Sequence, residues 1–100
     1  MPTFAEAESF ANDWKKLSKA EQALFLAAVK LLVEDLKRKQ QPRKSLRVKG
    51  VQGKKGVFEM TWSMGEHDGR ATFQYGEEII EGEAHVIWRR IGNHGVFKDA

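Results

Sequence analysis

The segment GRATFQYG, residues 69–76, has the regular alternation of a β-strand with one buried face. Polar and apolar side chains take turns along it, with Arg70, Thr72 and Gln74 on one face and Ala71, Phe73 and Tyr75 on the other. The segment VFEMTWS, residues 57–63, alternates in the same way, and the loop GEHDG, which contains two acidic residues, joins the two. We therefore expect an antiparallel hairpin with a core-facing side and a polar side.

Two further strands are expected, one before this hairpin in the sequence and one after it. In the one before it, apolar and basic residues alternate: Leu46, Arg47, Val48 and Lys49. A turn rich in glycine and lysine follows at residues 53–56. The run at residues 86–92 is also strongly strand-like and contains Arg89 and Arg90, which point to opposite faces of a regular strand. Each arginine shares its face with apolar residues, so the alternation alone does not decide which of the two lies on the polar face. We favour Arg90 for that face.

The N-terminal third has the three- and four-residue apolar spacing of two helices. The first is expected between about Ala5 and Leu17. The second begins at Ser18, which forms an S-x-x-E capping box with Glu21, and ends before Pro42. Its apolar arc is broad, so residues at the edge of the arc are expected to remain available for a partner: Leu26 and Val33.

Helices followed by antiparallel strands predict an α+β fold, with two N-terminal helices packed on one face of a mainly antiparallel, four-stranded twisted sheet. The 100 residues, 41% of them hydrophobic, are enough for one modest core and hence a single domain over residues 1–100. The absence of cysteine excludes a disulfide framework and a thiolate metal site. The longest apolar run, residues 23–29, is too short to cross a bilayer, so we expect a cytoplasmic protein with no membrane partner.

The formal charge of +3 favours an anionic partner. Basic residues concentrate between Lys37 and Lys55, in KRKQQPRKSLRVKGVQGKK. The same concentration is typical of a solvated helix end followed by a linker, because cations are favoured in the last turn of a helix. Charge alone therefore leaves an anion-binding surface and a solvated surface equally open.

The order of segments resembles the RelE/ParE toxin superfamily: two helices, then LRVKGVQG, GVFEMTWS, GRATFQYG and VIWRRIGNHGVF. The ending IGNHGVF is most similar to the RelE and YafQ-like branch. The resemblance covers nearly the whole chain and implies a toxin of a bacterial type II toxin–antitoxin pair, with a cognate antitoxin as partner. It also implies an endoribonuclease that cleaves messenger RNA on the ribosome, since many members have this activity. Gyrase poisons share the fold, which keeps that function as an alternative.

Three positions match the motifs of the resembled family: Lys49 before the glycine of the first strand, Arg70 early in the third, and His94 in the terminal motif. Glu59 stands where the best-known RelE has a lysine. Phe97 takes the place of a terminal aromatic residue, and it lacks the hydroxyl that some members use. The sequence departs from the family at these last two positions.

These residues suit attack of a ribose 2′-hydroxyl on the adjacent phosphate, which needs a base, an acid and cations. We expect His94 to transfer protons and Arg70 and Lys49 to hold the phosphate. Glu59 is either the base or a residue that orients a cation, and a plain cross-strand ion pair is an equally good interpretation. Further residues are expected to contact RNA: Arg47, Lys54, Lys55, Gln74, Arg90 and Phe97.

No metal-ligand spacing and no phosphate-binding loop occur in the sequence, so we expect neither a metal ion nor a cofactor. A third class of function is also open. The chain would then be a non-catalytic, partner-binding domain of the same fold, in which the edge of the second helix matters more than His94.

Overall fold

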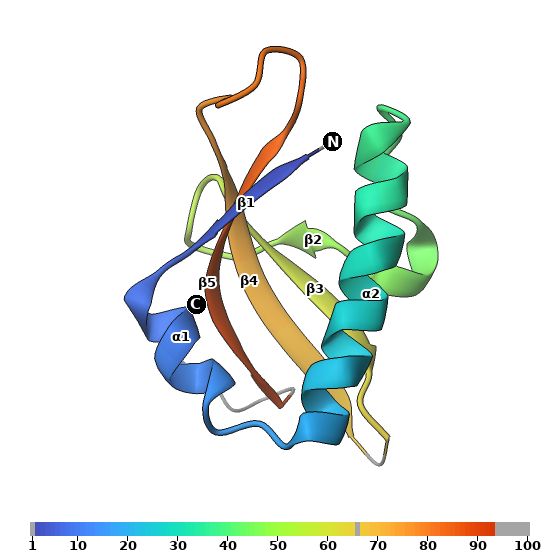
Figure 1. Ribbon diagram of the computed structural model, residues 1–100, viewed down its shortest axis with the longest axis vertical. Coiled ribbons are helices and arrows are strands. Elements are labelled where there is room, and N and C mark those ends of the chain that lie inside the picture. The colour runs from blue at the N-terminus through green and yellow to red at the C-terminus, as the bar shows by residue number, and fades with distance from the viewer. Residues whose placement is uncertain (1, 66, 94–100) are drawn as a thin grey trace.

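The computed structural model describes residues 2–65 and 67–93 of the 100-residue chain. Within these residues, two α-helices and five strands form the fold (Figure 1). In chain order the elements are β1 (Thr3–Glu6), α1 (Glu8–Trp14), α2 (Lys19–Lys37), a 3₁₀ turn (Lys44–Leu46), β2 (Lys49–Gly50), β3 (Val57–Ser63), β4 (Asp68–Gly76) and β5 (His85–Asn93). The α+β class expected from the sequence is confirmed.

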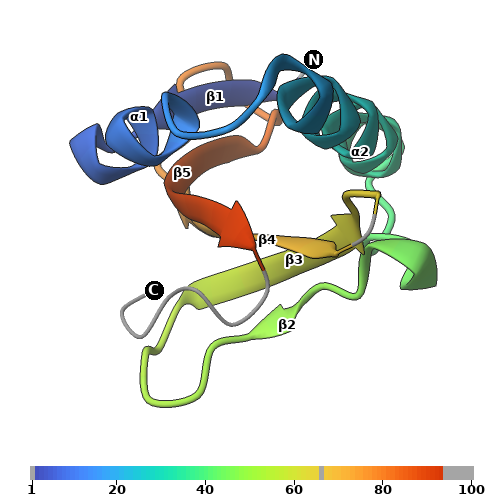
Figure 2. The same cartoon turned by 90° about the horizontal axis from the view of Figure 1, so that it is seen from below.

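The five strands form one mixed sheet in the order β1-β5-β4-β3-β2. The pairs β2–β3, β3–β4 and β4–β5 are antiparallel, whereas β1 lies parallel to β5. Seen end-on, the sheet is strongly curved, and both helices lie on one of its faces (Figure 2). Among the described residues no helix lies on the other face, and the expectation of a four-stranded sheet is wrong by one strand.

The additional strand comes from the region expected to begin the first helix. Residues Thr3–Glu6 pair with β5, and their flanks are held by bonds from the Thr3 N–H to the Ala84 carbonyl (2.9 Å) and from the Ala7 N–H to the Trp88 carbonyl (2.8 Å). These bonds pair backbone groups at one edge of β5 that would otherwise lack partners. This pairing outweighs the helical tendency of the apolar spacing at Ala5 and Ala7. As a result α1 has only seven residues.

The second helix begins and ends as the sequence predicts. The Ser18 hydroxyl accepts from the Glu21 N–H (3.1 Å), and the Ser18 N–H donates to Glu21 Oε1 (2.8 Å), which completes the capping box. The helix ends at Lys37, and Lys39 with φ of 59° turns the chain away before Pro42. Neither helix of the described residues is long and apolar enough to span a bilayer.

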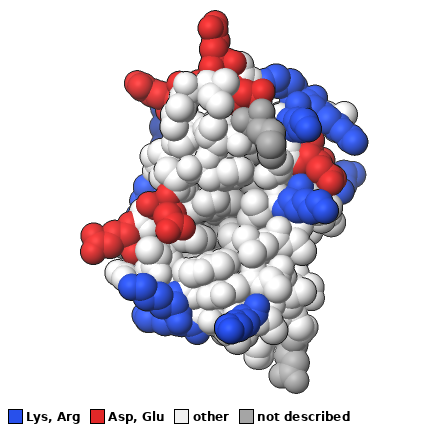
Figure 3. Space-filling view, in the orientation of Figure 1, with Lys and Arg blue, Asp and Glu red and all other residues white. Residues whose placement is uncertain are grey.

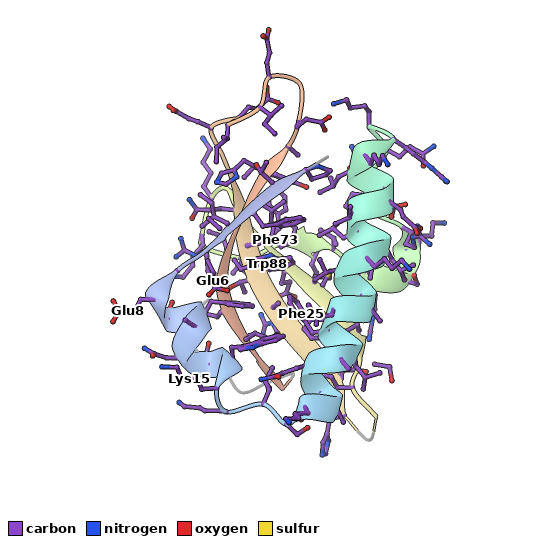
Figure 4. The ribbon with its side chains drawn as sticks, viewed as in Figure 1. Glu6, Glu8, Lys15, Phe25, Phe73 and Trp88 are labelled. Atoms are coloured by element: carbon purple, nitrogen blue, oxygen red, sulfur yellow. The ribbon has the colours of Figure 1, made fainter. Side chains whose placement is uncertain are left out.

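The core lies between α2 and the sheet and is rich in aromatic rings. Phe25 of α2 stands 5.1 Å, centroid to centroid, from both Trp62 of β3 and Trp88 of β5. Phe73 of β4, fully buried, contacts Trp88 at 5.3 Å (Figure 4). Each such side chain contributes about 1.5–3 kcal/mol through burial, so this contact group fixes α2 on the sheet.

Two strands differ from expectation. Residues 44–46 form a 3₁₀ turn and Arg47 is left-handed, with φ of 47°, so the first expected strand shrinks to Lys49–Gly50. In β5 a bulge shifts the register, because Thr72 pairs with Arg90 while the next residue, Phe73, pairs with Trp88. The last strand is therefore not regular, and both Trp88 and Ile91 reach the core.

Candidate functional site

A row of polar residues crosses the sheet on the face that carries no helix. The register places Lys49 of β2 beside Glu59 of β3, Glu59 beside Thr72 of β4, and Thr72 beside Arg90 of β5. Met60 and Trp62 point into the helix-side core, so the alternating residue Glu59 lies on the opposite face. Arg70 lies two residues before Thr72 and shares its face. The polar face expected from the sequence is thus present.

Three of the four residues expected to be catalytic lie in direct contact. The Glu59 carboxylate accepts from Arg70 Nε at 2.8 Å, and Arg70 Nη2 donates to the same oxygen, Oε2. The Lys49 ammonium lies 3.3 Å from the other oxygen, Oε1. We call these three residues the cation cluster. The fourth residue, His94, lies outside the described residues, as does Phe97.

Burial explains why the cation cluster holds together. Glu59 is only 4% exposed, and a carboxylate that far from water is unfavourable unless its oxygens are paired with cations. The pairing in turn fixes Arg70, whose side chain is 20% exposed. Lys49 differs, because its side chain is 72% exposed and its ammonium meets solvent. In this arrangement the Glu59 carboxylate orients two cations. The contacts therefore agree both with a role for Glu59 in orienting a cation and with a plain cross-strand ion pair.

Arg90 pairs with a residue that the sequence analysis missed. Its Nε and Nη2 donate to the two carboxylate oxygens of Asp13 in α1, at 2.6 and 3.2 Å. Asp13 Oδ2 also accepts from the Ile91 N–H at 3.1 Å. Asp13 is 8% exposed and so closes the part of the β5 edge that β1 does not reach. A signal existed in the sequence, since Asp13 sits three residues after Phe10 on the buried side of the first helix.

The other residues expected to contact RNA are spread over the polar face and its rim. Gln74 Oε1 accepts from Arg89 Nη1 at 2.6 Å. Arg47 forms a salt bridge with Asp68 at 3.1 Å, with both side chains about half exposed. Lys54 and Lys55 lie in the turn between β2 and β3, where Lys55 is exposed and Lys54 is half-buried. The structure therefore brings Lys49, Glu59 and Arg70 together and leaves these residues around them.

A second feature lies on the helix side. A groove of about 380 Å³ runs between α2 on one wall and β1 with α1 on the other, lined by Phe4, Glu6, Phe10, Trp14, Phe25, Leu26, Val29 and Trp88. Figure 3 shows this face as a largely uncharged hollow, and Figure 4 places Glu6 and Glu8 on the β1 and α1 side of it. Leu26 is 57% exposed, as expected, whereas Val33 is half-buried. We call this feature the helix-side groove.

Within residues 2–65 and 67–93, no three His, Asp or Glu side chains lie close enough together to hold a metal ion.

Comparison with known proteins gives one structural match. No protein-family model matches the sequence, and no curated protein matches it. The chain is similar to a chain in the crystal structure of the E. coli DinJ–YafQ complex, with a TM-score of 0.62 and 10% sequence identity. The similarity covers 99% of this chain and 100% of that chain. At this identity the match shows the fold, which is RelE/YafQ-like, with five strands in place of the four expected.

Proposed function

We propose that this protein is the toxin of a bacterial toxin–antitoxin pair and that it cleaves messenger RNA on the ribosome. The fold supports the proposal, because it matches a chain of the DinJ–YafQ complex from end to end and agrees with the sequence resemblance. The observation that carries the chemistry is the cation cluster. Lys49 and Arg70, held by the buried Glu59, offer two positive charges on a face that neither described helix covers.

In the proposed reaction a ribose 2′-hydroxyl attacks the adjacent phosphorus. The new bond from the 2′-oxygen to phosphorus forms while the bond from phosphorus to the 5′-oxygen breaks. A base takes the proton of the 2′-hydroxyl, and an acid donates a proton to the departing 5′-oxygen. The cut therefore leaves a 2′,3′-cyclic phosphate and a 5′-hydroxyl, and the scheme needs no metal ion.

The residues take separate roles in this scheme. Arg70 and Lys49 neutralise the charge that builds up on the phosphate oxygens, and Glu59 keeps both cations in place. We assign proton transfer to His94, because an imidazole titrates near neutral pH. Lys54 and Lys55 suit contacts with the RNA backbone that do not depend on sequence.

Four other residues complete the proposed RNA surface: Arg47, Gln74, Arg90 and Phe97. Arg90 and Gln74 already hold protein partners, Asp13 and Arg89, so RNA would meet side chains whose direction is fixed in advance. Such contacts are expected to position the RNA strand, and not to supply most of the affinity for RNA.

The proposed partner is a cognate antitoxin. An acidic segment of it would cover the cation cluster by charge complementarity. The helix-side groove offers a second contact, because seven of its eight lining residues are apolar and Leu26 is more than half exposed.

The proposal is tested by expressing the protein without an antitoxin and mapping RNA ends. We expect growth arrest, with new 5′-hydroxyl ends in messenger RNA. His94→Ala should fold and relieve the arrest, whereas His67→Ala, in an exposed loop, serves as the matched control. Intact messenger RNA together with DNA breaks would favour a gyrase poison instead. A folded His94→Ala protein that stays fully toxic would remove His94 from the mechanism.

A further inference from the structure

The loop between β4 and β5 projects from one end of the molecule and has an unusual composition. Residues 77–83, EEIIEGE, carry four glutamates and two adjacent isoleucines. Ile79 is 70% exposed and Ile80 is 52% exposed. Figure 1 shows this loop, in orange, at the top of the molecule, and Figure 3 shows acidic side chains gathered there. We call residues 77–83 the acidic loop.

The acidic loop has a fixed shape. The Glu78 carboxylate accepts from the Gly82 N–H at 3.1 Å, and the Ile80 carbonyl accepts from the Glu83 N–H at 3.0 Å. Gly82 adopts φ of +83°, which side-chain-bearing residues rarely take. The two isoleucines are thus presented to water by an ordered turn. Adjacent exposed apolar side chains that are held by an ordered turn and flanked by glutamates are typical of a contact surface.

A basic surface lies next to the acidic loop at the same end of the molecule. The last turn of α2 and its cap expose Lys37, Arg38 and Lys39. Lys39 bridges the two surfaces, because its ammonium donates to the Gly82 carbonyl. In Figure 1 the end of α2 stands beside the loop at the top of the molecule. One end of the protein therefore carries an acidic half, a basic half and an apolar pair.

Such a surface is complementary to itself. A second copy can be turned by 180° about an axis perpendicular both to the long axis of the molecule and to the line that joins the acidic loop to the end of α2. When this copy is set end to end with the first, each acidic loop faces the basic end of the other α2. A twofold interface requires this reciprocity, since the same patch serves both copies. We propose that the acidic loop and the basic end of α2 form a twofold dimer interface with a second copy of this chain, in which Ile79 and Ile80 of each copy pack against the basic end of the other copy's α2.

The dimensions of the molecule set the strength of this contact. The molecule measures 37 × 25 × 23 Å, so its end offers an area at the low end of specific protein interfaces. The dimer is accordingly weak, with a dissociation constant in the micromolar range, and it is sensitive to salt because ion pairs contribute much of its attraction. The interface also leaves the cation cluster open, because Arg70 lies six residues before the end of β4, about 20 Å away.

The proposal is independent of catalysis and is tested by sedimentation velocity over a range of about 5 to 500 µM, at low and high salt. We expect a monomer–dimer equilibrium that shifts toward monomer by about tenfold in dissociation constant at high salt. Ile79→Ser/Ile80→Ser should weaken the dimer at least tenfold. The matched control is Leu24→Ser, which alters a 40% exposed leucine outside this surface and should change nothing.

A charge exchange makes the result specific to this pairing. Glu77→Lys/Glu81→Lys and Lys37→Glu/Arg38→Glu should each be monomeric alone, and their equimolar mixture should form a heterodimer. Circular dichroism confirms that each variant is folded before it is mixed. A protein that stays monomeric up to 500 µM overturns the proposal. A dimer that ignores both the isoleucine and the charge variants also overturns it, because another surface then makes the contact.

Discussion

Arg43 binds Asp35 through three hydrogen bonds and thereby ties the segment after α2 back onto the helix. The Arg43 N–H and Nε donate to Oδ2 at 2.8 and 3.0 Å, and Nη2 donates to Oδ1 at 2.9 Å. The Asp35 side chain is only 7% exposed. This pair sets the path of the basic segment that leads from α2 to Lys49 in β2.

The first prediction concerns the pH dependence of this pair. Hydrogen bonding and charge from Arg43 hold the pKa of Asp35 below its usual value. A depressed folded pKa stabilises the protein above the unfolded pKa, near 3.8, and this stabilisation is lost as the pH falls through the folded value. We therefore expect Asp35→Asn to lower the melting temperature at pH 7 and to flatten its decline below pH 4. Thermal melts from pH 2 to pH 7 provide the measurement, and a variant that melts in parallel with the parent at every pH would contradict it.

The second prediction concerns Asp13. Its buried carboxylate accepts two bonds from Arg90 and one from the Ile91 N–H, so Asp13→Ala leaves a backbone donor and a cation without this acceptor. We expect a loss of about 2–3 kcal/mol in the free energy of unfolding, measured by urea titration. Asn12→Ala on the exposed side of α1 is the matched control. Equal losses for the two variants would mean that α1, and not its carboxylate, holds the edge of β5.

Asp13 also shows where sequence reasoning stopped. The core strands β3 and β4, the capped start of α2 and the helix-free face all follow from local alternation and spacing, and the contact of Glu59 with Arg70 follows from two adjacent strands in register. The strand at Thr3–Glu6 does not, because its pairing depends on β5, more than 80 residues away. The bulge beside Arg90 is likewise a property of two strands together.

The third prediction separates binding from cleavage at Glu59. Glu59→Gln removes the negative charge that holds Lys49 and Arg70 while it nearly preserves the side-chain volume. The two cations then repel one another, so cleavage should fall by about 10- to 100-fold as their placement is lost. RNA affinity should rise a few-fold, because the face gains one net positive charge. Glu8→Gln, which changes an exposed residue of α1, controls for net charge. Unchanged cleavage with unchanged affinity would reduce Glu59 to a structural ion pair.

The fourth prediction distinguishes a shaped contact from a simple charge at Arg70. Arg70→Lys keeps the positive charge, yet an ammonium cannot reproduce the planar set of donors that binds Glu59 and that is proposed to hold the phosphate. We expect single-turnover cleavage to fall by about 100-fold with little change in the salt dependence of RNA binding. Arg47→Lys provides the matched control, because Arg47 is half exposed and pairs with Asp68 at the rim. If Arg70→Lys and the parent cleave at the same rate, Arg70 acts only as a surface charge.

The last prediction concerns the antitoxin and the two surfaces it is proposed to cover. Charge steering toward the cation cluster should make association fast at low salt and slower as ionic strength rises. Apolar burial in the helix-side groove should instead govern dissociation, since salt does not screen it. Leu26→Asp places a carboxylate on the exposed wall of that groove, so it should raise the dissociation rate by about tenfold or more while leaving the salt dependence of association intact.

Stopped-flow and surface-binding kinetics over a salt series measure both rates for the parent, Leu26→Asp and Leu24→Asp. Leu24 is the matched control, because it is also an exposed leucine of α2 and does not line the helix-side groove. An on-rate that ignores salt would remove the cation cluster from the antitoxin interface. Equal dissociation of Leu26→Asp and the parent would remove the groove, and Leu24→Asp dissociating faster than Leu26→Asp would move the contact to the opposite flank of α2.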